Sequence, residues 1–449
     1  MVLVRNVVVG MLLLCAVVPS WAVAAEDEGD LKTTIEAMKQ RLRDQDRRIA
    51  ELETHQATSQ PTTEQIKQVV REMKADTKEG LGMPTWWDGV KLIGDFRLRY
   101  HGDYYDFRNA NGTPKADRNR ARFRLRVGLT KTWLDGQLET TFRLASGDSN
   151  DPTTTNQTLT GDYSKKIVWI DLAYAKYAPK AIKGLAIIGG KMITPWVTND
   201  IFFDTDVNPE GFWAEYKAPK IADFVEPFVG SGFFILNENS TAGDATAGIF
   251  QGGVKMEAIK NIKYTVAGIY QDYARYDTTA TGNSNVVFAR GNDYPLNLIP
   301  RFRVAGVSNN LEFPVFNKPL VLIGDWAHNC GENDPMHQYS GQNNAYCAGL
   351  NYGVNKKKGD WSLKYRYAYI EADSMPGYFT DSDFGYANRK GHVFGGMYNI
   401  MDNLTIGPTL YFTQPIFAPT TTTATTVPLN GNPNEKLTTT LFVDLVWKF

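Results

Sequence analysis

Five arginines stand at alternate positions in the segment RNRARFRLRV, residues 118–127. They are Arg118, Arg120, Arg122, Arg124 and Arg126. Guanidinium groups bind carboxylates and phosphates through paired hydrogen bonds, so a row of them could handle anions. Taken alone, the row fits a nucleic-acid-binding arm, a solvated strand face, or the wall of a passage for charged solutes.

The charge of the whole chain argues against nucleic acid as the partner. Its 449 residues carry a formal net charge of −1. Because non-specific binding to nucleic acid requires many phosphates to be neutralised, a chain without excess positive charge is poorly suited to it. We therefore expect no nucleic-acid partner.

The sequence lacks the short motifs of common hydrolases and metalloenzymes. It has no G-x-S-x-G, no H-E-x-x-H and no paired cysteine motif, and its five histidines fall in different segments. Nucleophilic catalysis needs a nucleophile held beside a base, and nothing near His101 or His392 supports such a pair. The sequence predicts no enzyme, no catalytic residue, no metal site and no cofactor.

Residues 1–25 have the layout of a secretory signal peptide. Arg5 precedes the apolar core 7–18, and small residues follow at Ala24 and Ala25. This order predicts cleavage after Ala24 or Ala25. A membrane anchor is the alternative, although the apolar core is short for a spanning helix.

Two cysteines remain outside this segment. The chain has three, and Cys15 lies within the apolar core, which leaves Cys330 and Cys347 on either side of the polar segment 331–346. In an exported chain this spacing favours one disulfide that clamps a loop. Two free thiols are the alternative.

Residues 26–80 carry helical periodicity. From Leu31 to Leu52 apolar residues alternate at spacings of four and three, with a polar break at Gln45, which is a heptad seam. A second amphipathic piece, 62–74, follows Pro61. Because so short a coil is marginal in water, we expect it to form where other contacts already hold chains together, as in an oligomer. A monomeric helix or a flexible spacer is the alternative.

From residue 84 to the end, a period of two replaces the helical period. Candidate strands fall at 91–101, 120–132, 137–146, 166–177, 185–191, 211–217, 224–233, 247–257, 262–274, 301–313, 319–328, 346–355, 361–372, 389–399, 404–413 and 436–449. The connections between them alternate between short turns and long polar segments.

This alternation of connections is typical of a transmembrane barrel, with short turns toward the periplasm and long loops outside. Most candidate strands are near the length of about 10 residues that spans a membrane, and a closed sheet leaves no unpaired edge in lipid. The sequence therefore predicts an all-β transmembrane barrel of about 16 antiparallel strands over 84–449. A short α-helical coiled coil precedes it, and outer-membrane lipid surrounds it.

The period of two also separates lipid-facing from lumenal side chains. Phe123 and Leu125 suit the lipid face, whereas a charge there costs about 2–4 kcal/mol near the bilayer centre. The same alternation directs further basic residues inward. The predicted basic wall comprises Arg97, Arg99, Arg120, Arg122, Arg124, Arg126, Arg143, Arg301, Arg303, Lys364 and Arg366. The alternative role for these arginines is purely structural, with each one satisfied by a neighbouring Asp or Glu.

Several segments resemble the Putative porin family of Gram-negative outer membranes. They are GDFRLRY at 94–100, NRARFRLRVGL at 119–129, LASGDSNDPTTTNQTL at 144–159 and FVDLVWKF at 442–449. The plan is also similar to sucrose and phosphate porins, which carry a periplasmic coiled coil before a trimeric sixteen-stranded barrel. The resemblance implies passive diffusion of small solutes or ions through a homotrimer. A terminal Phe449 resembles the last residue of such barrels and implies the barrel-assembly machinery as a partner.

In sixteen-stranded porins the third outer loop folds into the barrel and narrows it. By position, this loop corresponds to 192–211 here. The candidate constriction residues are Trp196, Asp200, Phe202, Phe203, Asp204, Asp206 and Glu210. Carboxylates facing a basic wall would create a transverse field that orients dipolar solutes. Alternatively, these carboxylates cap a turn or bind a calcium ion.

These features predict an outer-membrane porin for small hydrophilic solutes with a modest preference for anions. A channel specific for an oxyanion or a sugar is one alternative. A structural tether that holds the envelope through the coiled coil is another.

Overall fold

The computed structural model describes residues 36, 39–41, 43–47, 87–109, 112–148, 151–240, 243–276, 290–292, 302–331, 341–417 and 435–449. The chain divides into two compact units, Met1–Asp88 and Gly89–Phe449. In the first unit residues 36, 39–41 and 43–47 are helical, and Lys39 lies 3.4 Å from Glu36 across one helical turn. The predicted signal peptide, 1–25, and most of the predicted coiled coil, 26–80, lie outside the described residues, so both stay predictions. No helix in the described part of the chain is long and apolar enough to cross a membrane.

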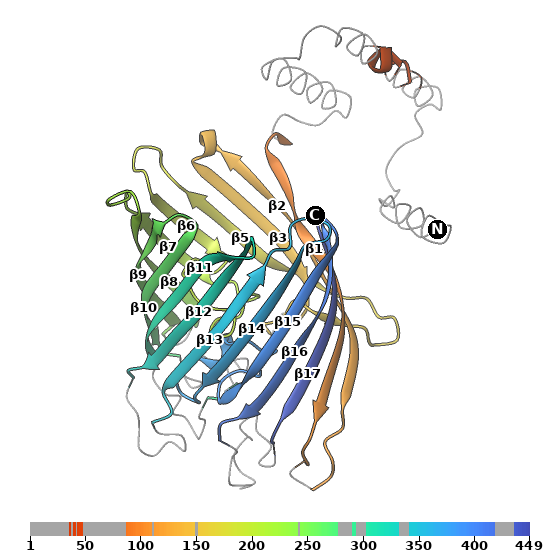
Figure 1. Cartoon of the computed structure of the whole chain (residues 1–449), viewed down its shortest axis with the longest axis vertical. Coiled ribbons are helices and arrows are strands. Elements are labelled where there is room, and N and C mark those ends of the chain that lie inside the picture. Colours follow the sequence, from red (N-terminus) through yellow and green to blue (C-terminus); the bar gives the residue numbers. More distant parts are fainter. Residues whose placement is uncertain are drawn as a thin grey trace. The chain divides into compact units, whose positions relative to one another are not determined.

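The second unit is one antiparallel sheet (Figure 1). Its strands are β1 (Val90–Tyr105), β2 (Arg118–Trp133), β3 (Leu138–Ser146), β4 (Gln157–Thr158), β5 (Val168–Tyr177), β6 (Leu185–Lys191), β7 (Glu210–Lys217), β8 (Val225–Asn237), β9 (Ala245–Ile259), β10 (Ile262–Ala274), β11 (Arg303–Val315), β12 (Lys318–Asn329), β13 (Asn344–Gly353), β14 (Trp361–Ile370), β15 (Arg389–Met401), β16 (Leu404–Pro415) and β17 (Thr438–Lys448).

The sheet closes into a barrel because β1 pairs with both β2 and β17. Of the 17 strands, β4 has only two residues and pairs with β2 from within the connection between β3 and β5. The other 16 strands form the wall, each next to its neighbour in sequence. The predicted all-β barrel of about 16 strands is confirmed, and the predicted strands overlap the observed ones throughout.

Connections alternate in length, as predicted. Two-residue and slightly longer turns join the strands at one end of the barrel, and the strand ends that border the long connections lie at the other end (Figure 1). Phe316 and Asn317, which join β11 to β12, both have positive φ, at 47° and 61°. This is the geometry of a type I′ turn, whose twist matches that of the two strands.

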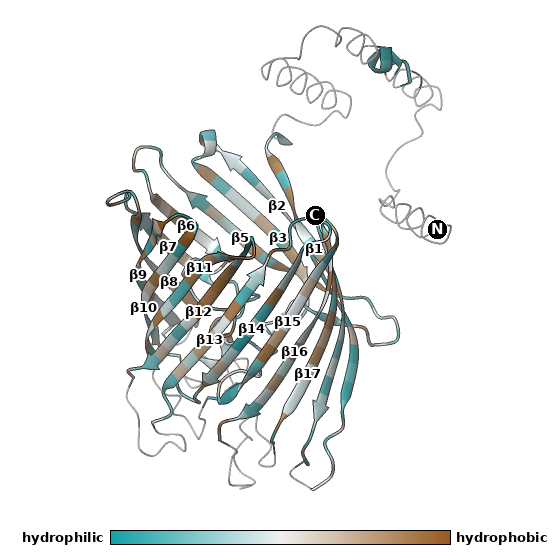
Figure 2. Cartoon of the chain, viewed as in Figure 1, coloured by the Kyte–Doolittle hydropathy of each residue, from teal (hydrophilic) through white to brown (hydrophobic). Residues whose placement is uncertain are grey.

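The outer face of the wall is apolar. Phe142, Phe212 and Phe250 are exposed there, and along β17 the exposed Val443 and Trp447 alternate with buried residues. Figure 2 shows apolar colours distributed along the strands of the wall. Because a protein in water buries most of its large apolar side chains, an outer face of this kind fits contact with lipid.

The predicted disulfide is not formed, because both thiols are free. Cys347 on β13 pairs in register with Asp325 on β12, whereas Asn329 donates its amide N–H to the carbonyl of Asn343. Cys330 is therefore five register positions from Cys347. At about 3.4 Å per residue the two lie about 17 Å apart along the strands, far beyond the about 4.4–6.8 Å that a disulfide spans.

Candidate channel constriction

The connection 192–209, between β6 and β7, folds into the barrel. Trp196 packs edge-on against Phe234 of β8, at 5.4 Å between ring centroids, and lies 6.0 Å from Trp213 of β7. The amide N–H of Val197 donates to Oε1 of Gln251 on β9 at 2.8 Å, and Gln251 donates back to the Val197 carbonyl at 2.9 Å. These wall residues have inward-facing, buried side chains, so the segment lies against the inner face of the barrel.

The tip of this loop reaches the far part of the wall. Asn199 donates a hydrogen bond to Asp325 on β12 at 2.6 Å. Asp200 accepts one from Nζ of Lys364 at 3.0 Å and one from Nε of Arg366 at 2.9 Å, both on β14. The prediction that carboxylates of this loop face basic residues of the wall therefore agrees with the contacts made by Asp200.

On its way back the loop meets the arginine row. Asp206 lies 3.4 Å from Nη1 of Arg126 and 3.7 Å from Nη1 of Arg124 on β2. Asp206 also accepts hydrogen bonds from the amide and hydroxyl of Thr155, at 3.2 and 3.0 Å. The loop is thus held by ion pairs to β14 and to β2.

A second connection, 371–388 between β14 and β15, joins the first loop. The amide of Asp204 donates to the carbonyl of Phe379 at 2.8 Å, and the amide of Asp381 donates to the carbonyl of Ile201 at 3.0 Å. Phe203 stacks on Phe379 at 5.9 Å. This junction and its carboxylates were missed from the sequence. The alternating Asp381 and Asp383 in a long polar connection were the available signal, but nothing in it identified the partner loop.

The arginines of β1 and β2 point inward, as predicted, and most are paired with carboxylates. Asp95 on β1 accepts from Arg124 at 2.6 Å and from Arg126 at 2.5 Å. Arg99 donates to both oxygens of Asp444 on β17, at 2.7 and 2.8 Å. Further inward pairs join Arg99 to Asp383, Arg120 to Asp103 and Arg143 to Asp171. The basic wall is therefore also a network of ion pairs, which was the alternative role for these residues.

Arg97 and Arg122 differ from their neighbours. Arg97 donates from Nη2 to the side-chain oxygen of Asn156 at 2.5 Å, and Arg122 donates to the Asn156 carbonyl at 3.1 Å. The Nε atom of each is buried without a hydrogen-bond partner, and neither forms an ion pair among the described residues. Their positive charge is therefore less compensated than that of Arg99 or Arg124.

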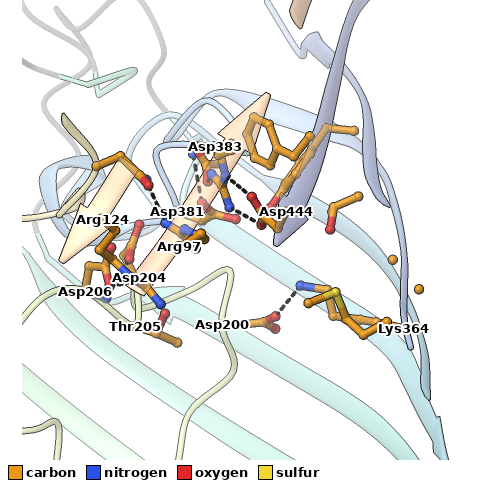
Figure 3. A pocket seen from close by; sticks show the side chains of 18 of the residues that line it. Arg97, Arg124, Asp200, Asp204, Thr205, Asp206, Lys364, Asp381, Asp383 and Asp444 are labelled. Atoms are coloured by element: carbon orange, nitrogen blue, oxygen red, sulfur yellow. Dashed lines mark hydrogen bonds and ion pairs between the residues drawn. The ribbon is translucent and has the colours of Figure 1, made fainter. Parts of the chain in front are cut away.

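The infolded loops leave a cavity of about 400 Å³ against the wall (Figure 3). Its charged lining consists of Arg97, Arg99, Arg124, Lys364, Asp200, Asp204, Asp206, Asp381, Asp383 and Asp444. Figure 3 shows the pair Asp200–Lys364, joined by a dashed line, among the charged side chains that line the cavity. We call this cavity the constriction.

The loop carboxylates fall into two electrostatic classes. Burial alone would raise the pKa of Asp200, but Lys364 and Arg366 outweigh it and hold the pKa at about 2. Burial raises the pKa of Asp381 to about 8, and the nearby Asp383 adds to the effect. Burial likewise raises the pKa of Asp204, together with the charge of Asp381. Near neutral pH, the constriction therefore contains both ionised and proton-bearing carboxyl groups.

A calcium site was the alternative for the loop carboxylates. Across the described residues, no group of three or more His, Cys, Asp or Glu side chains is arranged to hold a metal ion. The contacts of Asp200 and Asp206 are instead with basic and hydroxyl side chains.

Two of the predicted positions, Arg303 and Glu210, lie elsewhere. Arg303, at the start of β11, lies on the same face of the strand as Val307, which pairs with the exposed Trp326. Arg303 therefore faces outward at the rim of the barrel, where Asp272 lies 3.8 Å away. Its assignment to the inner wall is wrong. Glu210 begins β7 and pairs at 2.7 Å with Lys191, exposed and outside the constriction lining, so that assignment is wrong too. Arg301 lies outside the described residues.

The last predicted residue, Phe449, ends the strand that closes the barrel. Its ring packs against Trp447 at 5.4 Å between centroids, and its amide donates to the Gly94 carbonyl at 3.2 Å. Phe449 thus joins the C-terminus to the beginning of β1. Whether it is recognised during assembly stays a prediction.

Comparisons with known proteins agree with this architecture. The OprB porin of Pseudomonas putida, in a high-pH structure, matches with a TM-score of 0.51 and 11% identity, over 80% of this chain and 94% of that one. OmpT of Vibrio cholerae, in its trimer form, matches with a TM-score of 0.45 and 10% identity, over 81% of this chain and 100% of that one. A variant of Rh. blastica porin matches with a TM-score of 0.41 and 11% identity, over 80% of this chain and 100% of that one.

At the level of sequence, no curated protein matches the chain. The profile of the Putative porin family does match, over residues 110–293 and 255–427, and these two ranges together cover most of the barrel. The family and the closed barrel are those of a channel in a bacterial outer membrane. The chain belongs to the Putative porin family.

Proposed function

We propose that the chain forms a diffusion channel for small hydrophilic solutes in a Gram-negative outer membrane. The observation that carries the proposal is the constriction, a cavity of about 400 Å³ that two infolded loops leave against the wall. Its lining of charged groups offers hydrogen bonds in place of the hydration water that a polar solute gives up. An apolar solute gains nothing equivalent there.

The ion preference of this channel is expected to be weak. Six carboxylates and four basic side chains line the constriction, but burial raises the pKa of Asp381 to about 8, so this group bears a proton near neutral pH, and burial raises the pKa of Asp204 as well. The numbers of negative and positive charges that line the constriction are then nearly equal. The less compensated charges of Arg97 and Arg122 support the modest anion preference predicted from the sequence.

A sugar-specific channel is the less supported alternative. Sugars stack on aromatic rings, and within the described residues the lining contributes Tyr411 and Phe442 alone as aromatic side chains. Arginines that lack a carboxylate partner suit an oxyanion better.

We also propose a homotrimer, which is supported by the heptad seam of 31–52 and by the resemblance to trimeric porins.

Conductance of the purified protein in a planar bilayer tests the proposal. We expect long-lived, ohmic channels, and a salt gradient across the bilayer would give the sign and size of the ion preference. A protein that inserts as a folded barrel but conducts no ions would contradict the channel function. Light scattering of the detergent-solubilised protein would give its oligomeric state.

A further inference from the structure

The constriction holds a guanidinium group, that of Arg97, which forms no direct ion pair with any carboxylate of the described residues. Arg97 is fixed through Nη2 by the buried Asn156, and its buried Nε has no hydrogen-bond partner. In the register of the wall, Arg97 lies opposite Arg124, which already pairs with Asp95. Because Arg97 lines the cavity and forms no ion pair among the described residues, its charge would attract a carboxylate that enters the cavity from solution.

The same constriction holds two carboxyl groups that form no direct ion pair with a basic side chain of the described residues, although Lys364 lies near one of them, Asp381. Asp204 and Asp381 are both buried, and neither forms an ion pair among the described residues, although Asp200, Asp206 and Asp383 do. Main-chain hydrogen bonds of the loop junction fix their positions. An ammonium group beside them would favour their ionised form and would supply the missing counter-charge.

These two unmet requirements lie in one cavity, and they are opposite in sign. An anion alone could pair with Arg97 but would lie close to the buried carboxyl groups. A cation alone could pair with these carboxyl groups but would lie close to the arginines. We propose that the constriction is a two-point site for small zwitterions that carry a carboxylate and an ammonium group, with Arg97 receiving the carboxylate and Asp204 with Asp381 receiving the ammonium. This inference rests on the proposed channel function and names its preferred solute class.

Binding in the constriction must be weak so that the solute can leave again. We therefore expect the faster permeation of zwitterions at low solute concentrations. The test uses proteoliposomes that contain the full chain and are loaded with isotope-labelled β-alanine or with propionamide, an uncharged solute of similar size. At low concentration we expect β-alanine to leave about tenfold faster, the factor expected from one charge-assisted hydrogen bond. Equal rates would overturn the inference and leave the channel function intact. If propionamide left the proteoliposomes no faster than it leaves protein-free liposomes loaded with the same solute, the channel function itself would be contradicted.

Charge-removing variants locate the site. We expect Arg97→Gln and Asp381→Asn each to reduce the β-alanine rate to that of propionamide. Arg303→Gln and Glu312→Gln remove one charge of each sign from exposed ion pairs outside the constriction, and they should keep the wild-type ratio. Migration of every variant as a compact barrel in unheated gels verifies that it has folded, and the ratio of the two efflux rates is compared within each variant.

A measurement on the wild-type channel does not depend on the folding of any variant. β-Alanine should reduce the single-channel ion current in a concentration-dependent manner, because an occupied constriction obstructs ions. Propionamide at the same concentrations should not. Block by neither solute, or the same block by both, would overturn the two-point site.

Discussion

Asp200 of the infolded loop accepts a hydrogen bond at 2.9 Å from Nε of Arg366, whose side chain is almost completely buried on β14. This contact attaches the tip of the loop to the wall opposite the arginine row. An ion pair between an exposed pair of side chains would contribute little, but removing one partner from a buried pair leaves a charge without compensation. The position of the loop therefore depends on this contact.

Replacing Asp200 by Asn should release the loop tip. The cost of leaving Arg366 buried without its partner is about 3–5 kcal/mol, which is enough to favour a detached loop. We expect a larger and noisier single-channel current than that of the wild-type protein. Glu210→Gln, which alters an exposed pair outside the constriction, is the control, and a wild-type current in Asp200→Asn would contradict the role of the contact.

Ion preference should shift toward cations as pH rises through about 8. The buried Asp381 has its pKa raised to about 8, so it is largely protonated at pH 6 and ionised at pH 10. The charged groups around it are Asp200, Asp204, Asp383 and Lys364, and Asp204 also has a raised pKa. The reversal potential in a salt gradient measures the shift, and Asp381→Asn should reduce it.

The same carboxyl group should make the loop junction less stable at high pH. A pKa near 8 in the folded protein and near 4 in the unfolded chain means that the folded state binds more protons between these values. Its stabilising contribution is complete below about pH 4 and is lost as pH rises through about 8. The protection factor of the Asp381 amide, which donates to Ile201, should fall over this interval once the intrinsic base-catalysed exchange rate is divided out, and Asp381→Asn should flatten the dependence.

Removing charge from the arginine row should move the preference toward cations. Arg122→Ala should do this most clearly, since its charge lacks a carboxylate partner among the described residues. Arg124→Ala should have a smaller effect, because Arg126 still compensates the two carboxylates, Asp95 and Asp206, that Arg124 contacts. Reversal potentials in matched salt gradients compare the two, and the rim variant Arg303→Gln should resemble the wild-type protein.

The two thiols should differ in reactivity. Cys330 is exposed and Cys347 is buried between strands, so a maleimide should label Cys330 in the folded protein and Cys347 only after denaturation. Mass spectrometry of tryptic peptides identifies the labelled residue. A protein that resists labelling at both positions until it is reduced would contradict the free thiols.

The closure of the barrel should be sensitive to any side chain at Gly94. A Cβ atom there would overlap the carbonyl of Arg126 and approach the Phe449 ring to 2.8 Å. Gly94→Val should therefore hinder the pairing of β1 with the C-terminal strand and reduce the fraction of protein that migrates as a compact barrel in unheated gels. Gly248→Ala adds a Cβ where no atom lies within 4 Å and serves as the control.

The strands of the barrel wall could be predicted from the sequence because apolar and polar residues alternate along them. In β2 and β17 every second residue is apolar, and lipid on one side and water on the other allow only one orientation of the strand. Arg303 shows where this argument fails. At the rim the outer face meets water, so a charge can face outward, and alternation no longer identifies the lumen.

The interior of the barrel could be predicted only in part. The acidic loop that contains Asp200 and Asp206 was assigned to the constriction by its position among the outer loops. The pairing of Ile201 and Asp204 with the segment 379–381 depends on main-chain hydrogen bonds, which any residue except proline can donate, so the side chains give no signal for it. The disulfide prediction was wrong for a similar reason. The register between β12 and β13 is set by pairing along the whole strands, and the positions of two cysteines do not determine it.

The junction between the two loops also makes the narrowed passage depend on distant parts of the chain. The first loop lies between β6 and β7, and its partner follows β14, near the end of the chain. A barrel without the segment after β14 would lack the hydrogen bonds that join this segment to the first loop. Early and late parts of the chain therefore have to be present together for the lumen to be narrowed in this way.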